Sequence, residues 1–118
     1  MKALIIDDER SVHSVVSRML TRSGIECLVA ATATAGISEF TTHHKEIGVV
    51  LLDLTLPDLS GEEVFNAITA IDPDAKIVVM SGHNVEHLPE GMKGNILSYI
   101  QKPVRLADIK SIVTSIIG

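Results

Sequence analysis

Short apolar runs alternate with longer amphipathic segments along the whole chain. The runs are four or five residues long and rich in Ile, Val and Leu, and they cover residues 3–6, 27–30, 49–52, 76–80 and 96–100. Continuous apolar runs of this length are typical of parallel strands that are buried on both faces. We therefore expect five strands in one parallel sheet.

Most segments between the runs carry apolar residues at helical spacing. In the first of them, apolar side chains recur at i, i+3, i+4, i+7 and i+8, and they are Val12, Val15, Val16, Met19 and Leu20. Gly24 stands where this helix would end. The same periodicity predicts helices within 33–45, 61–71 and 109–117.

The segment 83–95 departs from this pattern. Pro89, Gly91 and Gly94 each oppose a regular helix. We therefore expect an irregular fourth helix, short or broken, between the last two strands.

Regular alternation of strand and helix predicts an α/β fold, in which right-handed crossovers place helices on both faces of the sheet. The 118 residues have the size of one domain, and no segment has the composition of a linker or an internal repeat. We expect a single domain over residues 1–118, with no effector domain in this chain.

Composition narrows the functional classes. The formal net charge is −5 and the basic residues are scattered, which disfavours a nucleic-acid-binding face. The single cysteine, Cys27, allows no internal disulfide, and no run is long enough to span a bilayer or to form a signal peptide. We expect a cytoplasmic protein that binds a partner protein, a cation or a small molecule.

Polar side chains stand at the carboxyl ends of four of the five predicted strands. Asp7 and Asp8 follow the first run, Asp53 the third, Ser81 the fourth and Lys102 the fifth. Open parallel sheets bind ligands at this end of their strands. The sequence therefore predicts one site that these side chains share.

The residue types at this site favour phosphoryl chemistry. Carboxylates placed close together raise one another's pKa unless a cation lies between them, and Mg²⁺ (or Mn²⁺) prefers oxygen ligands of this kind. Lys102 and Ser81 could take the oxygens of a phosphoryl group, and Asp53 could act as the nucleophile.

The ordered set of motifs resembles the receiver domains of two-component response regulators. The motifs are "DDE" after the first strand, "LLDLTLPDLSG" after the third, "MSG" after the fourth and "YIQKP" around the fifth. They fall in the family's order and spacing, and the resemblance covers essentially the whole chain. It implies a flavodoxin-like, doubly wound sheet with the strand order 2-1-3-4-5.

The resemblance also implies a metal site. Asp53 would be the phosphoacceptor, Asp8 would bind the metal ion directly, and Asp7 would help directly or through water. Thr55 would offer its backbone carbonyl oxygen as a further ligand.

Other residues match the family's positions for phosphate pairing and switching. Lys102 would pair with the phosphoryl group, and Pro103 follows it in a step that is often cis in this family. Ser81 would be the switch hydroxyl and Tyr99 the switch aromatic. Thr55 and His83 stand at two variable positions that would tune the lifetime of the phosphoryl group.

The function implied is that of a phosphoacceptor in a two-component system or phosphorelay. A sensor histidine kinase or a phosphotransfer protein would donate the phosphoryl group from a phosphohistidine. The surface of the fourth helix, fifth strand and last helix would then switch, and the chain would slowly dephosphorylate itself without being a free-standing enzyme. Its output partner stays open, whether another protein, a fused effector domain or a second copy after phosphorylation; we expect no nucleic acid or membrane contact.

Three other functions fit parts of the pattern. A haloacid-dehalogenase-type phosphohydrolase would carry its nucleophile after the first strand as Asp-x-Asp, where this chain has Asp-Asp-Glu at 7–9. A flavodoxin-like binding module would need a phosphate loop where these acids stand. A degenerate receiver would act only as a scaffold, but every core phosphorylation residue is present.

Overall fold

The computed structural model describes residues 1–82 and 88–117. These residues form a parallel sheet whose strands are β1 (Lys2–Ile6), β2 (Cys27–Ala30), β3 (Ile47–Asp53), β4 (Ile77–Ser81) and β5 (Ser98–Gln101). The helices are α1 (Arg10–Arg22), α2 (Ala33–His43), α3 (Gly61–Ile71) and α4 (Leu106–Ile116). The strand order β2-β1-β3-β4-β5 confirms the order that the resemblance implied.

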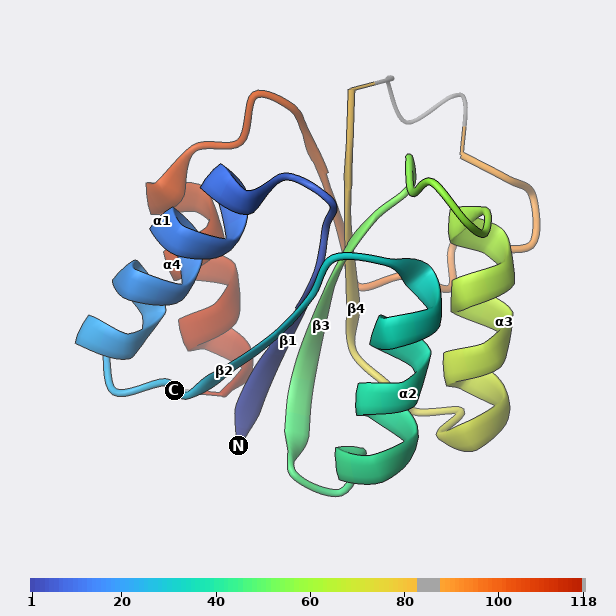
Figure 1. Cartoon of the computed structure of the whole chain (residues 1–118), viewed down its shortest axis with the longest axis horizontal. Coiled ribbons are helices and arrows are strands. Elements are labelled where there is room, and N and C mark those ends of the chain that lie inside the picture. The colour runs from blue at the N-terminus through green and yellow to red at the C-terminus, as the bar shows by residue number, and fades with distance from the viewer. Residues whose placement is uncertain (83–87, 118) are drawn as a thin grey trace.

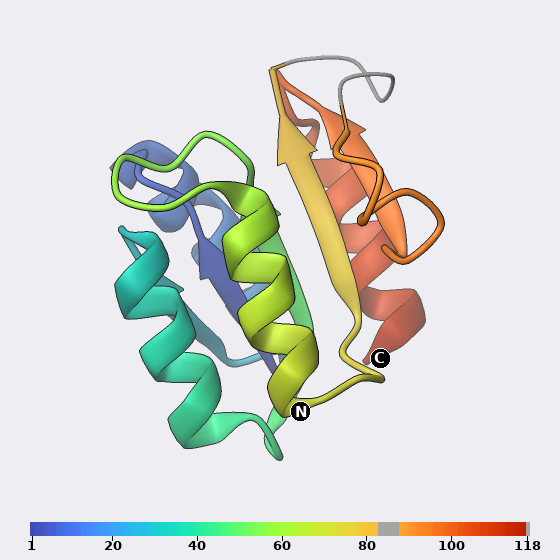
Figure 2. The same ribbon diagram turned by 90° about the vertical axis from the view of Figure 1, so that its right-hand side faces the viewer.

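Helices cover both faces of the sheet. Figure 1 shows α1 and α4 together on one face and α2 and α3 on the other, and Figure 2 shows α2 and α3 in front of the sheet with α4 behind it. Successive side chains of a strand point to opposite faces. Leu4 and Ile6 of β1 accordingly pack in the core beneath α2 and α3, and Ala3 and Ile5 pack in the core beneath α1 and α4. This double burial explains why the strands are continuous apolar runs.

The last strand begins later than the apolar pattern predicts. We expected residues 96–100, whereas β5 begins at Ser98. The Leu97 N–H donates to the carbonyl oxygen of Ile77, and the ladder with β4 starts at the pair Val78 and Ser98. Apolar content does not report where strand pairing begins, and Leu97 is in fact 48% exposed.

The irregular fourth helix was predicted for the segment 83–95. Its described part, residues 88–95, forms turns closed by hydrogen bonds from Met92 N–H to Pro89 and from Asn95 N–H to Met92. Leu88 and Met92 are buried in the core beneath α2 and α3. Apolar anchoring therefore holds these residues in place without a regular helix.

Among the described residues, none of the helices has the length and apolar character that a membrane span needs.

One side chain ties the loop after β3 to the start of α2. The Asp58 carboxylate accepts hydrogen bonds from the backbone N–H groups of Ala33 and Thr34, at 2.9 and 3.0 Å, and from the Thr34 hydroxyl. The Thr34 hydroxyl and the two N–H groups stabilise the charged carboxylate and lower the pKa of Asp58 to about 2. Because this loop follows Asp53 directly, the contact also helps to fix the carboxyl end of the sheet.

We predict that Asp58→Ala lowers the melting temperature at neutral pH and that Asp58→Asn lowers it less, since the amide keeps one acceptor oxygen. A depressed pKa stabilises the fold above the ordinary value of 3.8 and loses that contribution as the pH falls to about 2. The difference between wild type and Asp58→Ala should therefore shrink between pH 4 and pH 2 in thermal melts. The control is Asp74→Asn, an exposed acid in the turn before β4. An equal effect of the control would contradict the assignment.

Candidate functional site

Strand register places Asp7 beside Asp53. Ile6 of β1 pairs with Leu52 of β3, so the residue that follows each of them lies at the same level of the sheet. Asp7 is 0% exposed and Asp53 is 1% exposed, whereas Asp8 is exposed. Carboxylate oxygens of all three lie within 4.8 Å of one another. The expected convergence of these acids is therefore present in the structure.

Backbone N–H groups orient the two buried carboxylates. The Glu9 N–H donates to Oδ1 of Asp7 at 2.8 Å, and the Thr55 N–H donates to Oδ1 of Asp53 at 3.0 Å. His13 at the start of α1 donates through Nε2 to the carbonyl oxygen of Asp7. Each Oδ1 atom is thus held, and each Oδ2 atom is left to interact with the rest of the site.

Lys102 balances the charge of these acids. Its Nζ lies 3.2 Å from Oδ2 of Asp53, 3.2 Å from Oδ2 of Asp7 and 3.1 Å from Oε1 of Glu9. Burial lowers the pKa of Lys102, but the hydrogen bond to Glu9 and the charges of Asp53 and Asp7 outweigh it, so the pKa is raised above its ordinary value. The Lys102 ammonium therefore stays charged throughout the physiological range.

Glu9 is a site residue that the sequence interpretation did not assign. It occupies the N-cap position of α1 without a side-chain capping hydrogen bond, and its side chain reaches the Lys102 ammonium across 93 positions of sequence. The available signal was its place directly after the acidic pair. That place is equally typical of an acid at the start of a helix.

Burial raises the pKa of Asp53, and the charge of Asp7 raises it further. The Thr55 N–H and the Lys102 ammonium oppose this shift by stabilising the carboxylate, without cancelling it. A carboxylate held in this way is less solvated than an exposed one.

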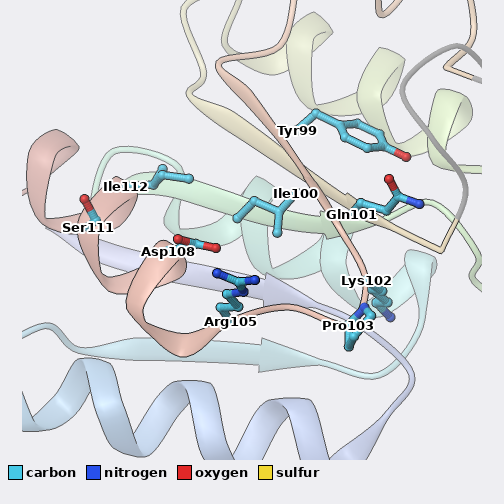
Figure 3. Close-up of a pocket in the computed structure, with 9 residues that line it drawn as sticks. All are labelled: Tyr99, Ile100, Gln101, Lys102, Pro103, Arg105, Asp108, Ser111 and Ile112. Carbon is cyan, nitrogen blue, oxygen red and sulfur yellow. The ribbon is translucent and has the colours of Figure 1, made fainter.

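Ser81 and Tyr99 come from the last two strands. Ser81 ends β4 and is fully buried, one residue beyond Met80, which is the register partner of Asp53. Tyr99 is half-buried on β5 and pairs with Val79. Figure 3 shows Tyr99 and Gln101 on one side of β5, away from α4.

The remaining predicted site residues are placed as follows. Thr55 is exposed, two residues after Asp53, and its role as a carbonyl ligand stays a prediction. The Lys102–Pro103 peptide bond is cis, as the resemblance implied. His83 lies outside the described residues, so its predicted part in phosphoryl lifetime is also left as a prediction.

The donor set fits a hard divalent cation. The three converging acids offer only oxygen atoms, as Mg²⁺ requires. Oδ2 of Asp7 is fully buried, and among the described residues it has no hydrogen-bond donor in acceptable geometry, although Lys102 lies within ion-pair distance. A buried carboxylate oxygen that lacks a hydrogen bond is free to coordinate a cation.

Comparison with known proteins identifies the family. Residues 3–114 match the response regulator receiver domain family. The chemotaxis protein CheY of Thermotoga maritima is 32% identical over 105 residues, which cover 86% of this chain and 85% of that protein. The crystal structure of a response regulator receiver domain protein from Clostridium thermocellum is 31% identical, with a TM-score of 0.89, and the match covers 98% of this chain and 93% of that one.

A longer relative shares the same region. The two-component response regulator ORR21 of Oryza sativa subsp. indica is 25% identical over 113 residues, which are 95% of this chain and 16% of that protein. The chain thus spans about a sixth of the length of this relative. The family match and the CheY relative lead to one conclusion: the chain belongs to the receiver domains of two-component response regulators.

Proposed function

We propose that this chain accepts a phosphoryl group on Asp53 from the phosphohistidine of a sensor kinase or phosphotransfer protein. The observation that carries the proposal is the buried Asp53 carboxylate, held 3.2 Å from the Lys102 ammonium beside the carboxylates of Asp7 and Asp8. This arrangement supplies a nucleophile together with countercharge for phosphoryl oxygens. Phosphoryl transfer depends mainly on positioning and charge stabilisation of this kind.

The reaction forms one bond and breaks another. A carboxylate oxygen of Asp53 attacks phosphorus, the P–N bond of the phosphohistidine breaks, and the imidazole leaves with the bonding electron pair and takes a proton from solvent. Lys102 then exchanges a carboxylate partner for a phosphoryl oxygen. The Ser81 hydroxyl, one residue beyond the register level of Asp53, donates a hydrogen bond to another phosphoryl oxygen.

Asp7, Asp8 and Asp53 would hold a Mg²⁺ (or Mn²⁺) ion, with the backbone carbonyl of Thr55 as a further ligand. The ion would neutralise charge on the phosphoryl oxygens. Without it, an incoming phosphoryl group would meet the carboxylates of Asp7, Asp8 and Asp53, and the one ammonium beside them is shared with Glu9. Among the described residues, Lys102 is the only cation within ion-pair distance of Asp7 and Asp53.

The output follows from the position of Ser81 and Tyr99 on adjacent strands. A phosphoryl group that accepts a hydrogen bond from the Ser81 hydroxyl would move that side chain. The move would shift Tyr99 and the surface of β5, α4 and residues 88–97 between two conformational populations. The chain acts in the cytoplasm and catalyses only its own phosphorylation and slow dephosphorylation, the latter tuned by Thr55 and His83. It is therefore not a free-standing enzyme.

We expect the wild-type chain to gain the mass of one phosphoryl group when incubated with a small phosphodonor and Mg²⁺. The gain should disappear in chelator, since the acids then repel the donor, and it should be absent in Asp53→Asn. Asp8→Ala should raise the Mg²⁺ concentration for half-maximal labelling by about tenfold or more, because it removes a carboxylate ligand. Intact mass spectrometry measures all of these.

The matched control for this labelling is Asp74→Asn, which changes an exposed acid in the turn before β4, away from the site. It should be labelled like wild type at a temperature where it is folded. Full labelling of Asp53→Asn, or labelling of wild type that is independent of divalent cations, would contradict the proposal.

Without metal, Asp53→Asn should stabilise the fold at neutral pH by on the order of 1 kcal/mol, because it removes a buried charge. The raised pKa means that the folded state holds the proton more tightly than the unfolded state. Wild-type stability is therefore lost as the pH rises above the ordinary value of 3.8 and through the raised value. The advantage of Asp53→Asn should grow over this range in urea melts, and a constant difference would contradict it.

Phosphorylation in the presence of Mg²⁺ should shift the amide NMR signals of Ser81 and of β5 more than those of α2. The reason is that β4 and β5 carry the proposed switch residues, whereas α2 lies against β1 and β2. Ser81→Ala should reduce the shift at Tyr99 while leaving Asp53 labelled. Unchanged signals in β5 on full labelling would count against the switch.

A further inference from the structure

Three of the four polar atoms of Asp7 are held by hydrogen bonds. The N–H group donates to the carbonyl oxygen of Ala30 at 3.1 Å, Oδ1 accepts from the Glu9 N–H, and the carbonyl oxygen accepts from the ring of His13. The fourth atom, Oδ2, lies 3.2 Å from the Lys102 ammonium. Of the three hydrogen bonds, the one from His13 alone comes from a side chain, so it is the one that a substitution removes.

His13 reaches Asp7 from the first turn of α1. Figure 1 shows the short loop that leads from the end of β1 into this turn. Side chains of a helix point back toward its start, which brings the ring of a residue in this turn to the end of the preceding strand. The ring is half-buried. Because a carbonyl oxygen can only accept, Nε2 of His13 carries the proton in this contact.

The contact with His13 also fixes the start of Asp8. The carbonyl group of Asp7 shares one rigid peptide plane with the N–H group and Cα of Asp8. The Asp8 side chain is exposed, and among the described residues no hydrogen bond or ion pair holds its carboxylate. Its place within 4.8 Å of the carboxylates of Asp7 and Asp53 therefore depends on the backbone from which it projects.

We propose that His13 is a positioning residue for the metal site. By holding the peptide between Asp7 and Asp8, its Nε2–H group keeps the Asp8 carboxylate beside that of Asp53, where both can bind Mg²⁺. His13 itself contributes no metal ligand, and it needs no change of charge to act. The inference rests on the proposed function, because that function supplies the metal ion.

Such positioning affects the affinity for the ion more than the chemistry of phosphoryl transfer. Mg²⁺ demands nearly ideal octahedral geometry, and few carboxylates hold it. If the peptide between Asp7 and Asp8 could rotate, the exposed Asp8 side chain would sample positions away from the site, and binding would have to restrict them. This cost weakens Mg²⁺ binding and leaves the Asp53 nucleophile unchanged.

The test compares His13→Leu with His13→Gln. Leu removes the hydrogen-bond donor, whereas the side-chain amide of Gln keeps an N–H donor of similar reach and does not ionise. We expect His13→Leu to raise the dissociation constant of Mg²⁺ by about tenfold, which is typical for the loss of a group that orients a metal ligand. His13→Gln should restore most of the affinity. Amide NMR titration of the unphosphorylated whole chain with Mg²⁺ measures each constant.

The matched control is His44→Leu. His44 is also half-buried, and its Nδ1 lies 3.3 Å from the carbonyl oxygen of Thr41. It stands at the end of α2 that leads into the start of β3, away from the acidic site. This variant should bind Mg²⁺ like wild type, and thermal melts in chelator establish that every variant is folded.

At saturating Mg²⁺, His13→Leu should take the phosphoryl group from a small phosphodonor as fast as wild type. Slower labelling under these conditions would overturn the inference, and so would an equal loss of Mg²⁺ affinity in His13→Gln or His44→Leu. Normal Mg²⁺ binding in wild type that is unchanged in His13→Leu would contradict the role of His13 alone. Absence of Mg²⁺ binding to wild type would contradict the proposed metal site and the inference with it.

Discussion

The site depends on one ammonium group shared between two buried carboxylates. Asp7 and Asp53 lose nearly all contact with solvent, and Lys102 lies 3.2 Å from each of them. Two buried negative charges side by side are unfavourable, and a single positive charge offsets them only in part, as the raised pKa of Asp53 indicates. The resting site is thus short of positive charge, which would favour the uptake of a cation and then of a phosphoryl group, as we propose.

The rest of the fold holds these charges together. Asp7 and Asp53 are fixed by the register of β1 and β3, and the Lys102 N–H is fixed by a 2.7 Å hydrogen bond to the carbonyl oxygen of Ser81. The strands carry apolar residues on both faces, so the sheet packs tightly between its two layers of helices. This close packing keeps the strand ends in place. Residues at the carboxyl ends of the strands can therefore be polar and functional without weakening the core.

The sequence predicted the elements because double burial leaves a strong apolar pattern, and it predicted which strand ends carry polar groups. It could not predict the partners of those groups. Glu9 contacts Lys102 and Asp58 contacts Thr34 through side chains of residues far apart in the chain, and both acids have ordinary local uses in helix starts and turns. The predicted start of the last strand at residue 96 was wrong by two residues, because pairing with β4, rather than apolarity, determines that β5 begins at Ser98.

We propose that the buried Asp53, rather than an exposed acid, receives the phosphoryl group. The most direct measurement is borohydride trapping of the labelled protein, which reduces an acyl phosphate to an alcohol and marks its position for peptide mass spectrometry. Asp8 and Asp58 provide internal comparisons, since both are exposed acids close to the same end of the sheet. We expect the reduced residue at position 53 alone, and only after labelling with Mg²⁺. A reduced residue at Asp8 or Asp58, with position 53 unmodified, would contradict it.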